Sequence, residues 1–196
     1  MIISRLKFMF LSLMALVFAN QVVESIDPLP DCIGTSRSQG LRKVVDDYLY
    51  SGTYTDKIDK RNAVITKYGE IEDWDVSRCT SLKRVFYQTK YYSPIGDPEW
   101  DLGDVDISKW DTSRVTTMEE AFLDTKTFNS DISKWDVSRV QSLVNTFASS
   151  NFNVDLSKWQ ISSVTSLKAA FYEAYEFNGD LSKWQTSRVT NLIDTF

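Results

Sequence analysis

The sequence predicts an α/β repeat fold, a right-handed solenoid whose turns each hold a short parallel strand and a short helix. The main observation is that Trp and Phe recur together, at Trp110, Trp135, Trp159 and Trp184 and at Phe122, Phe147, Phe171 and Phe196, with a period of 24–25 residues. Trp74 and Phe86 belong to an earlier, degenerate copy. A unit of this length cannot bury its apolar face alone, so we expect five turns stacked on one another.

Each unit has its own predicted strand and helix. Apolar positions fall at offsets 0, 3, 5 and 8 from the Ile or Leu that opens a unit, which is the spacing of leucine-rich repeats. The alternation Trp-x-[Val/Ile/Thr] predicts a short strand with both side chains on one face. Met118, Ala121 and Phe122 follow at helical spacing, behind Thr116 as the N-cap. The array is therefore predicted to be leucine-rich-repeat-like.

The Trp and Phe rows form the predicted core. Trp occupies an inward slot of each unit and buries a large area, so we expect burial in preference to an exposed platform for sugars. The predicted core residues are Trp74, Trp110, Trp135, Trp159, Trp184, Phe122, Phe147 and Phe171.

The segments outside the repeats have predicted roles of their own. Residues 1–25 place Arg5 and Lys7 before an apolar run of 12 residues, which is typical of a secretory signal peptide and too short for a membrane span. An uncleaved anchor is the alternative. Residues 26–69 are predicted to form a helical N-terminal cap, and 70–196 the five-turn array. The array stops part-way through a unit, so we expect a truncated C-terminus or a partner that covers this end.

Two helices and a disulfide are considered near the N-terminus. The first helix carries an apolar stripe and ends at Gly52, and the second covers Lys60–Tyr68. The stripe consists of Leu41, Val44, Val45, Tyr48 and Leu49. Cys32 and Cys79 permit one disulfide in an oxidising compartment, and the alternative is that Cys79 is a reduced core residue. The sequence does not decide whether they pair.

The composition excludes several function classes. The chain has 22 Lys+Arg against 27 Asp+Glu, a net charge of −5, and no His. Without His there is no Ser-His or Cys-His pair, no imidazole base and no ordinary zinc site. The acidic balance argues against nucleic acid. We expect no enzyme activity, because an enzyme built on the Asp rows would need paired carboxylates unique to one turn. We also expect no cofactor, and no membrane span in the mature chain.

The candidate binding residues lie in two places. Polar side chains flank each inward Trp, and stacked turns convert them into rows on the strand face. The alternative is that these rows form solvated Lys–Asp pairs and bind nothing. The insertion between Phe86 and Asp106 is the second place, either as a binding loop or as an aromatic lid over the first turn. The candidates are Lys109, Asp111, Lys134, Asp136, Lys158, Gln160, Lys183, Gln185, Tyr91, Tyr92 and Trp100.

A second acidic row opens the units, at Glu70, Asp106, Asp131, Asp155 and Asp180. Such carboxylates are suitable oxygen ligands for Ca²⁺ between turns. We expect them instead to accept backbone N–H bonds at the corner before each strand, because Asp commonly does so. No metal site is predicted.

The repeated text resembles a known family. The pattern [FN]-x-D-[IL]-S-x-W-[DQ]-[VTI]-S-x-V-[TQ]-x-[LM]-x-x-x-F is similar to the BspA-like leucine-rich-repeat surface proteins, also known from mycoplasma lipoproteins, and the similarity covers 70–196. The resemblance implies a secreted or cell-surface protein that adheres to extracellular proteins or matrix, and it supplies no catalytic residues. The lipoprotein cysteine of such proteins is absent from this sequence. The alternative function is a carbohydrate-binding surface module that uses exposed aromatic residues, with glycans as partners.

Overall fold

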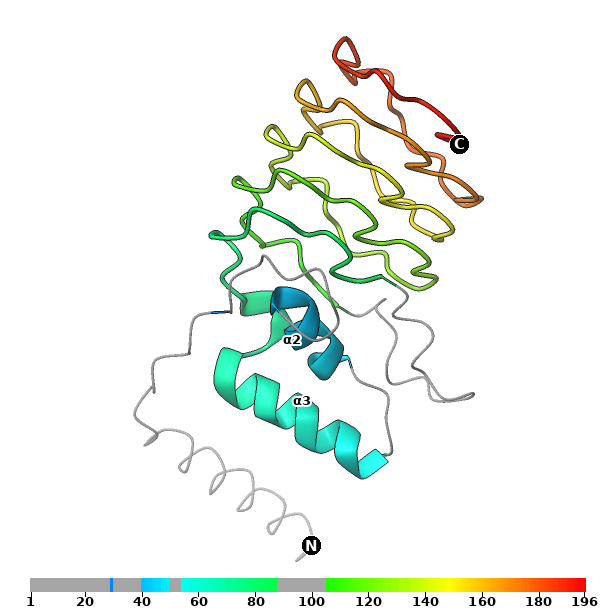
Figure 1. Cartoon of the computed structure of the whole chain (residues 1–196). Coiled ribbons are helices and arrows are strands. Elements are labelled where there is room, and N and C mark those ends of the chain that lie inside the picture. The colour runs from blue at the N-terminus through cyan, green and yellow to red at the C-terminus, as the bar shows by residue number, and fades with distance from the viewer. Residues whose placement is uncertain (1–28, 30–39, 50–53, 88–104) are drawn as a thin grey trace, which may run out of the picture.

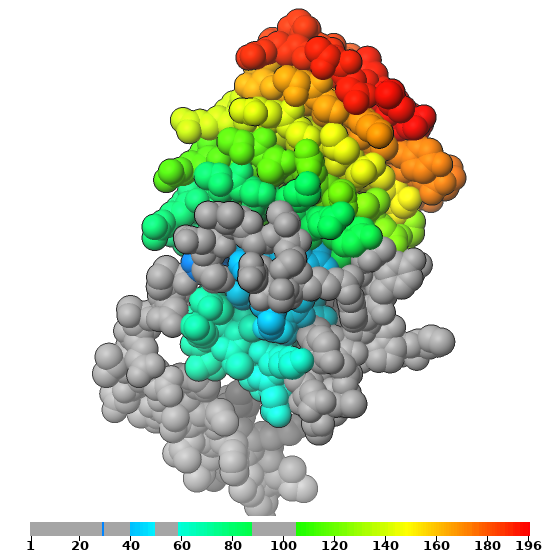
Figure 2. Space-filling model, viewed as in Figure 1, coloured from blue at the N-terminus to red at the C-terminus, as the bar shows by residue number. Residues whose placement is uncertain are grey.

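Two helices and a stack of irregular turns make up the described part of the chain (Figure 1). The computed structural model describes residue 29 and residues 40–49, 54–87 and 105–196. Helix α2 spans Gly40–Tyr48, helix α3 spans Tyr54–Tyr68, and the short 3-10 helix η1 spans Ile71–Asp73. The turns rise one above another from the helices to the C-terminus, and they appear as successive bands in Figure 2.

The α/β leucine-rich-repeat-like solenoid predicted from the sequence is wrong. In the described residues of the repeats there is no strand longer than one bridged residue, and no helix follows η1. Isolated parallel bridges join neighbouring turns instead, and they link Ser81, Thr117, Ser142, Ser166 and Asn191 in that order. These bridges lie in the segment that was predicted to be helical, and the Trp-x-Val segment predicted to be a strand contains none.

The segment predicted to be a helix bonds to the next turn. Alternate backbone N–H groups from Met118 to Asp124 donate to carbonyls of the following turn at 2.9–3.1 Å. The four acceptors are Ser142, Val144, Thr146 and Ala148. The intervening N–H groups donate to acceptors of their own turn; for example, the Ala121 N–H donates to the Met118 carbonyl. The backbone hydrogen-bond partners of this segment therefore lie one period away in the chain. A helix of a single turn would incur the full free-energy cost of nucleation and form very few hydrogen bonds.

Residues with a left-handed backbone interrupt the helical path in this segment. Arg84, Glu120, Asn145, Ala169 and Asp194 occupy the same position in successive units, and their φ angles lie between 50° and 60°. A right-handed helix cannot continue through such a residue. Asn and Asp adopt this conformation more readily than most residues, but Arg, Glu and Ala have no such preference and so do not indicate it in a sequence. The residue types at this position therefore carry no consistent signal against a helix.

Columns of aromatic rings run through the stack and form its core. The rings of Phe86, Phe122, Phe147 and Phe171 lie 5.4–5.5 Å apart, centroid to centroid, and the angles between neighbouring ring planes are 2–17°. The indoles of Trp74, Trp110 and Trp135 stack at 6.4 and 6.2 Å. These rings belong to one buried cluster that also includes the apolar face of α2.

Helix α2 packs on the first turn, and α3 packs on α2 (Figure 1). The Tyr48 ring meets the Trp74 indole edge-on at a centroid distance of 5.5 Å. The Arg42 side chain is 2% exposed, and its guanidinium donates to the carbonyls of Arg84 and Tyr87. The predicted helix and the burial of Leu41, Val44, Val45 and Tyr48 are confirmed, but the helix ends at Tyr48, earlier than the predicted stop at Gly52, and Leu49 lies just beyond it. The second helix is also present, but it begins at Tyr54, earlier than expected.

Only some of the remaining predictions for the N-terminal region concern residues that the structure describes. The signal peptide predicted at 1–25 lies outside the described residues, as does Cys32. Cys79 is buried at 1% exposure and is part of a disulfide. Among the described helices, none combines the length and the apolar character that crossing a bilayer requires.

Candidate binding face

Hydrogen bonds from the indoles fix each turn to the one before it. The indole Nε1–H of Trp135 donates to the Ile107 carbonyl at 3.0 Å, and the same carbonyl accepts the backbone N–H of Trp110 at 3.2 Å. Trp159 and Trp184 repeat the arrangement one and two turns later. Both the ring and the N–H of these side chains are therefore used inside the stack. The exposed fraction of Trp74, Trp110, Trp135 and Trp159 is only 2–4%, and Trp184 in the last turn is half-buried.

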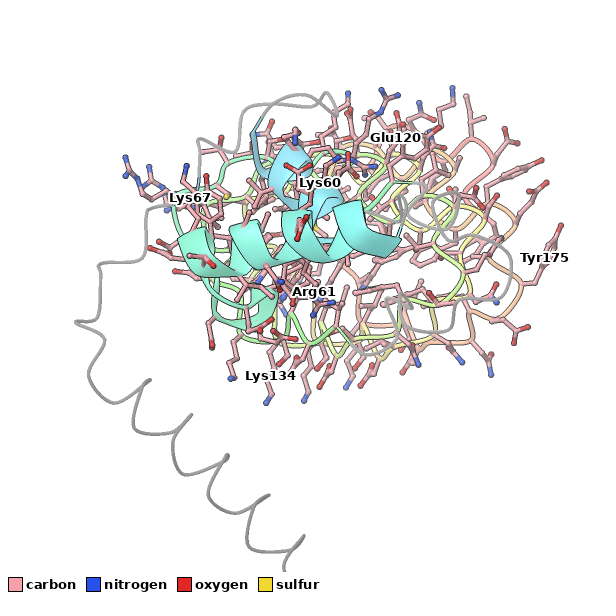
Figure 3. All side chains as sticks on the ribbon, turned by 90° about the horizontal axis from the view of Figure 1, so that it is seen from below. Lys60, Arg61, Lys67, Glu120, Lys134 and Tyr175 are labelled. Atoms are coloured by element: carbon pink, nitrogen blue, oxygen red, sulfur yellow. The ribbon has the colours of Figure 1, made fainter. Side chains whose placement is uncertain are left out.

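The structure places the predicted polar rows at the surface. All eight residues that flank the Trp positions are exposed: Lys109, Asp111, Lys134, Asp136, Lys158, Gln160, Lys183 and Gln185. Figure 3 shows Lys134 projecting away from the stack into solvent. The four lysines form no ion pair with any carboxylate in the described residues, so the lateral Lys–Asp pairs considered as the alternative are not seen there.

The aspartates of this surface are bonded to their own backbone. Asp111 accepts the backbone N–H of Ser113 at 3.0 Å. Asp106 and Asp131, which open two units, do the same with the serine two residues later. The serine hydroxyl and then the serine N–H lower the pKa of each of these carboxyl groups below its ordinary value. The corner role expected for the acidic row is confirmed for the four aspartates, whereas Glu70 accepts a hydrogen bond from the Tyr48 hydroxyl. No group of three metal-binding side chains exists within the described residues.

A groove follows the Trp segment on its C-terminal side and was not predicted. Its volume is about 420 Å³, and it spans four successive turns. The lining residues are Thr116, Arg139, Gln141, Ser163, Thr165 and Arg188. They come from the recurring text Ser-Arg-Val-Thr, so the same period that revealed the Trp row brings them together. The repeat period thus contained the signal for this groove, but the predicted strand led us to choose the residues beside Trp as the binding candidates.

The groove combines unpaired cations with hydroxyl groups. The Thr116 and Thr165 hydroxyls donate to carbonyls of the preceding turn at 3.0 and 3.1 Å, and the Ser163 hydroxyl donates to the Ser138 carbonyl at 2.7 Å. Their oxygen lone pairs are left as acceptors for a ligand. The guanidinium groups of Arg139 and Arg188 are exposed and have no hydrogen-bond or ion-pair partner among the described residues. The site is therefore suited to binding an anionic, hydrogen-bonding chain.

Other aromatic residues differ in their placement. Tyr91, Tyr92 and Trp100 lie outside the described residues. Phe128, Phe152 and Phe177 form a further column inside the stack, with centroid distances of 6.1 and 6.5 Å. The core predicted from the sequence did not include them, although they share the repeat period. Tyr175 is 87% exposed and projects from the stack (Figure 3).

Comparison with known proteins identifies one family. Neither the curated proteins nor the solved structures gave a significant match. The family match covers residues 59–105 and 99–196, which include all five units and part of α3. It does not confirm the BspA-like leucine-rich-repeat resemblance. Because the matched residues make up more than half of the sequence, the chain belongs to the family described as Mycoplasma protein of unknown function, DUF285.

Proposed function

We propose that this chain is a secreted or cell-surface protein that binds other proteins or extracellular matrix in an adhesion-type role, without catalysis. The observation that carries the proposal is the repetition of exposed, unpaired cations along a stack that buries most of its Trp and Phe rings. Repetition at each turn produces an extended surface, which matches a macromolecule better than a small ligand.

The disulfide supports a location outside the cytosol. Cys79 is in a disulfide, and such bonds persist mainly in oxidising compartments. The basic and apolar pattern of residues 1–25 supports export independently. Secretion or display at the cell surface is the simplest destination that satisfies both observations.

The carboxylates support binding in preference to catalysis. A general acid at neutral pH needs a raised pKa. Hydrogen bonds from Ser108, Ser113 and Ser133 shift the pKa values of their aspartate partners the opposite way. The same arrangement recurs in successive turns, whereas an active site needs groups that one turn alone supplies.

The carbohydrate-binding alternative receives less support. It requires aromatic faces open to solvent, and four of the five indoles of the Trp row are buried. The exposed rows are Lys, Asp, Gln, Arg and Thr, which are suited to charged and polar protein surfaces.

The proposal is tested by binding of the purified chain to a panel of immobilised extracellular matrix proteins, measured by biolayer interferometry. The double variant Lys134→Glu/Lys158→Glu reverses two charges of the Lys row, and we expect its association rate to fall several-fold because rim charges steer encounter. Lys168→Glu reverses an exposed lysine in the bridged segment and is the matched control. Binding of none of the panel, together with no labelling of intact cells by antibodies to the chain, would refute the proposed function.

A further inference from the structure

We propose that the groove lined by Arg139 and Arg188 binds an extended acidic peptide segment of the partner protein, with these two guanidinium groups each holding one carboxylate. The inference rests on the proposed function and names the chemistry of the partner that this groove recognises.

The chemistry of the lining favours a peptide. A guanidinium and a carboxylate form paired, charge-assisted hydrogen bonds, and both arginines are available for them. The Gln141 amide has both a donor and an acceptor, and the hydroxyl oxygens of Thr116 and Thr165 accept, so the lining complements peptide N–H and C=O groups. Among the described residues no aromatic ring lines the groove, so they offer no platform for a stacked sugar.

Charge is distributed unevenly along the stack and favours an acidic ligand at the groove. The turns that contain Ser163 and Arg188 have Gln160 and Gln185 beside Trp, where the two preceding turns have Asp111 and Asp136. The lysines on the other side of Trp are retained in all four turns. The turn of Arg188 therefore lacks this carboxylate and keeps both its lysine and its arginine, whereas the turn of Ser163 lacks both the carboxylate and the arginine. An acidic segment meets less repulsion beside Trp in these two turns than in the two before them.

The spacing of the two arginines predicts the spacing of the acidic residues. Bridges connect the turns of Arg139 and Arg188 through one intervening turn. Paired strands lie about 4.8 Å apart, so the two arginine positions are separated by about 10 Å. In a polyproline II helix, residues three apart share a face and are about 9 Å apart. An acidic residue at every third position of such a segment therefore meets both guanidinium groups.

The test uses the full chain and a fluorescein-labelled peptide of repeated Pro-Pro-Glu, titrated by fluorescence anisotropy. We expect Arg139→Gln/Arg188→Gln to weaken binding at least about tenfold, because two charge-assisted contacts are lost. Arg114→Gln is the matched control, since Arg114 has the same repeat position and exposure but does not line the groove, and we expect a change under about twofold. Ser163→Arg completes the row and is expected to tighten binding. The three arginines are exposed and Ser163 is half-buried, so thermal denaturation should show intact folding of all the variants.

Four outcomes overturn the inference. The double variant could bind the peptide as tightly as the unaltered chain, or the matched Pro-Pro-Gln peptide could bind equally well. A sulfated polysaccharide could also bind more tightly than the peptide with the same arginine dependence, which would make the ligand a glycan. If the double variant keeps full binding to matrix proteins, the groove proposal fails while the proposed function stands.

Discussion

At the scale of single residues, the carbonyl shared by two donors explains why Trp recurs. The Ile107 carbonyl accepts one bond from its own turn and one from the next indole. An aliphatic residue in the Trp slot would fill space but would leave the second bond unmade. The row therefore combines apolar burial with a directional contact that sets how one turn sits on another.

Replacement of Trp135 tests these two contributions separately. Trp135→Ala should lower the free energy of unfolding by about 3–5 kcal/mol, because a large buried side chain leaves a cavity. Trp135→Phe should cost less, about 1–2 kcal/mol, since Ile107 O keeps its bond from Trp110 and most of the volume is retained. Urea denaturation measures both. Trp184→Ala, at a half-buried position, is the control, and an equal loss there would contradict the account.

The aspartate–serine bonds predict a dependence of stability on pH. Hydrogen bonds from the neighbouring serines lower the folded-state pKa of Asp106, Asp111 and Asp131, whereas unfolded Asp titrates near about 3.9. Their contribution is therefore complete above the unfolded pKa and is lost as pH falls towards the lower folded values. The melting temperature should drop below about pH 4. Replacing all three by Asn should flatten this drop, and Glu176→Gln, at an exposed site outside these turns, should not.

At the scale of elements, the first helix closes the open end of the stack with a buried cation. Arg42 is 2% exposed and bonds to carbonyls of the first turn as well as to Asp46. Lys43 in the same helix makes an equivalent pair with Asp47, but its side chain is 44% exposed. Arg42→Met should cost about 3 kcal/mol, and Lys43→Met under about 1 kcal/mol. Similar losses in denaturant titrations of the two variants would show that the carbonyl contacts add little.

The bridged segment shows where sequence reasoning reaches its limit. The period and the burial of Met118, Ala121 and Phe122 could be predicted, because they follow from apolar spacing alone. The same spacing fits a helix, but the backbone of this segment instead forms hydrogen bonds to a turn a full period away, and these bonds determine its conformation. Such bonds leave no local pattern in the sequence. The groove was missed for a different reason: the repeat period itself aligns its residues, but the predicted strand pointed to the side chains beside Trp as the binding face.

Two adjacent alanines can test the left-handed position directly. Ala169 has a φ of 50°, while Ala170 is not among the residues with positive φ, and both are buried. Glycine relieves the strain at the first site and only adds flexibility at the second. Ala169→Gly should therefore be more stable than Ala170→Gly by about 1–2 kcal/mol in chemical denaturation. A β-branched residue worsens the clash, so Ala169→Val should be the least stable variant.

At the scale of the whole molecule, each turn contacts only its neighbours, so the stack should tolerate the loss of a complete unit but not of a partial one. Deleting residues 135–158 removes one period and places Trp159 where Trp135 was, which keeps the order of indoles, phenylalanines and bridging residues. We expect this shortened chain to fold cooperatively, with a smaller denaturant dependence because less surface is buried. Deleting only 135–146 places Phe147 in the indole slot and shifts every later residue out of register with the turn below it. Tryptophan fluorescence measures the unfolding of both deletion variants. We expect only the half-period deletion to lose cooperative unfolding, because backbone hydrogen bonds to the turn one period away take the place of strands and helices in this fold.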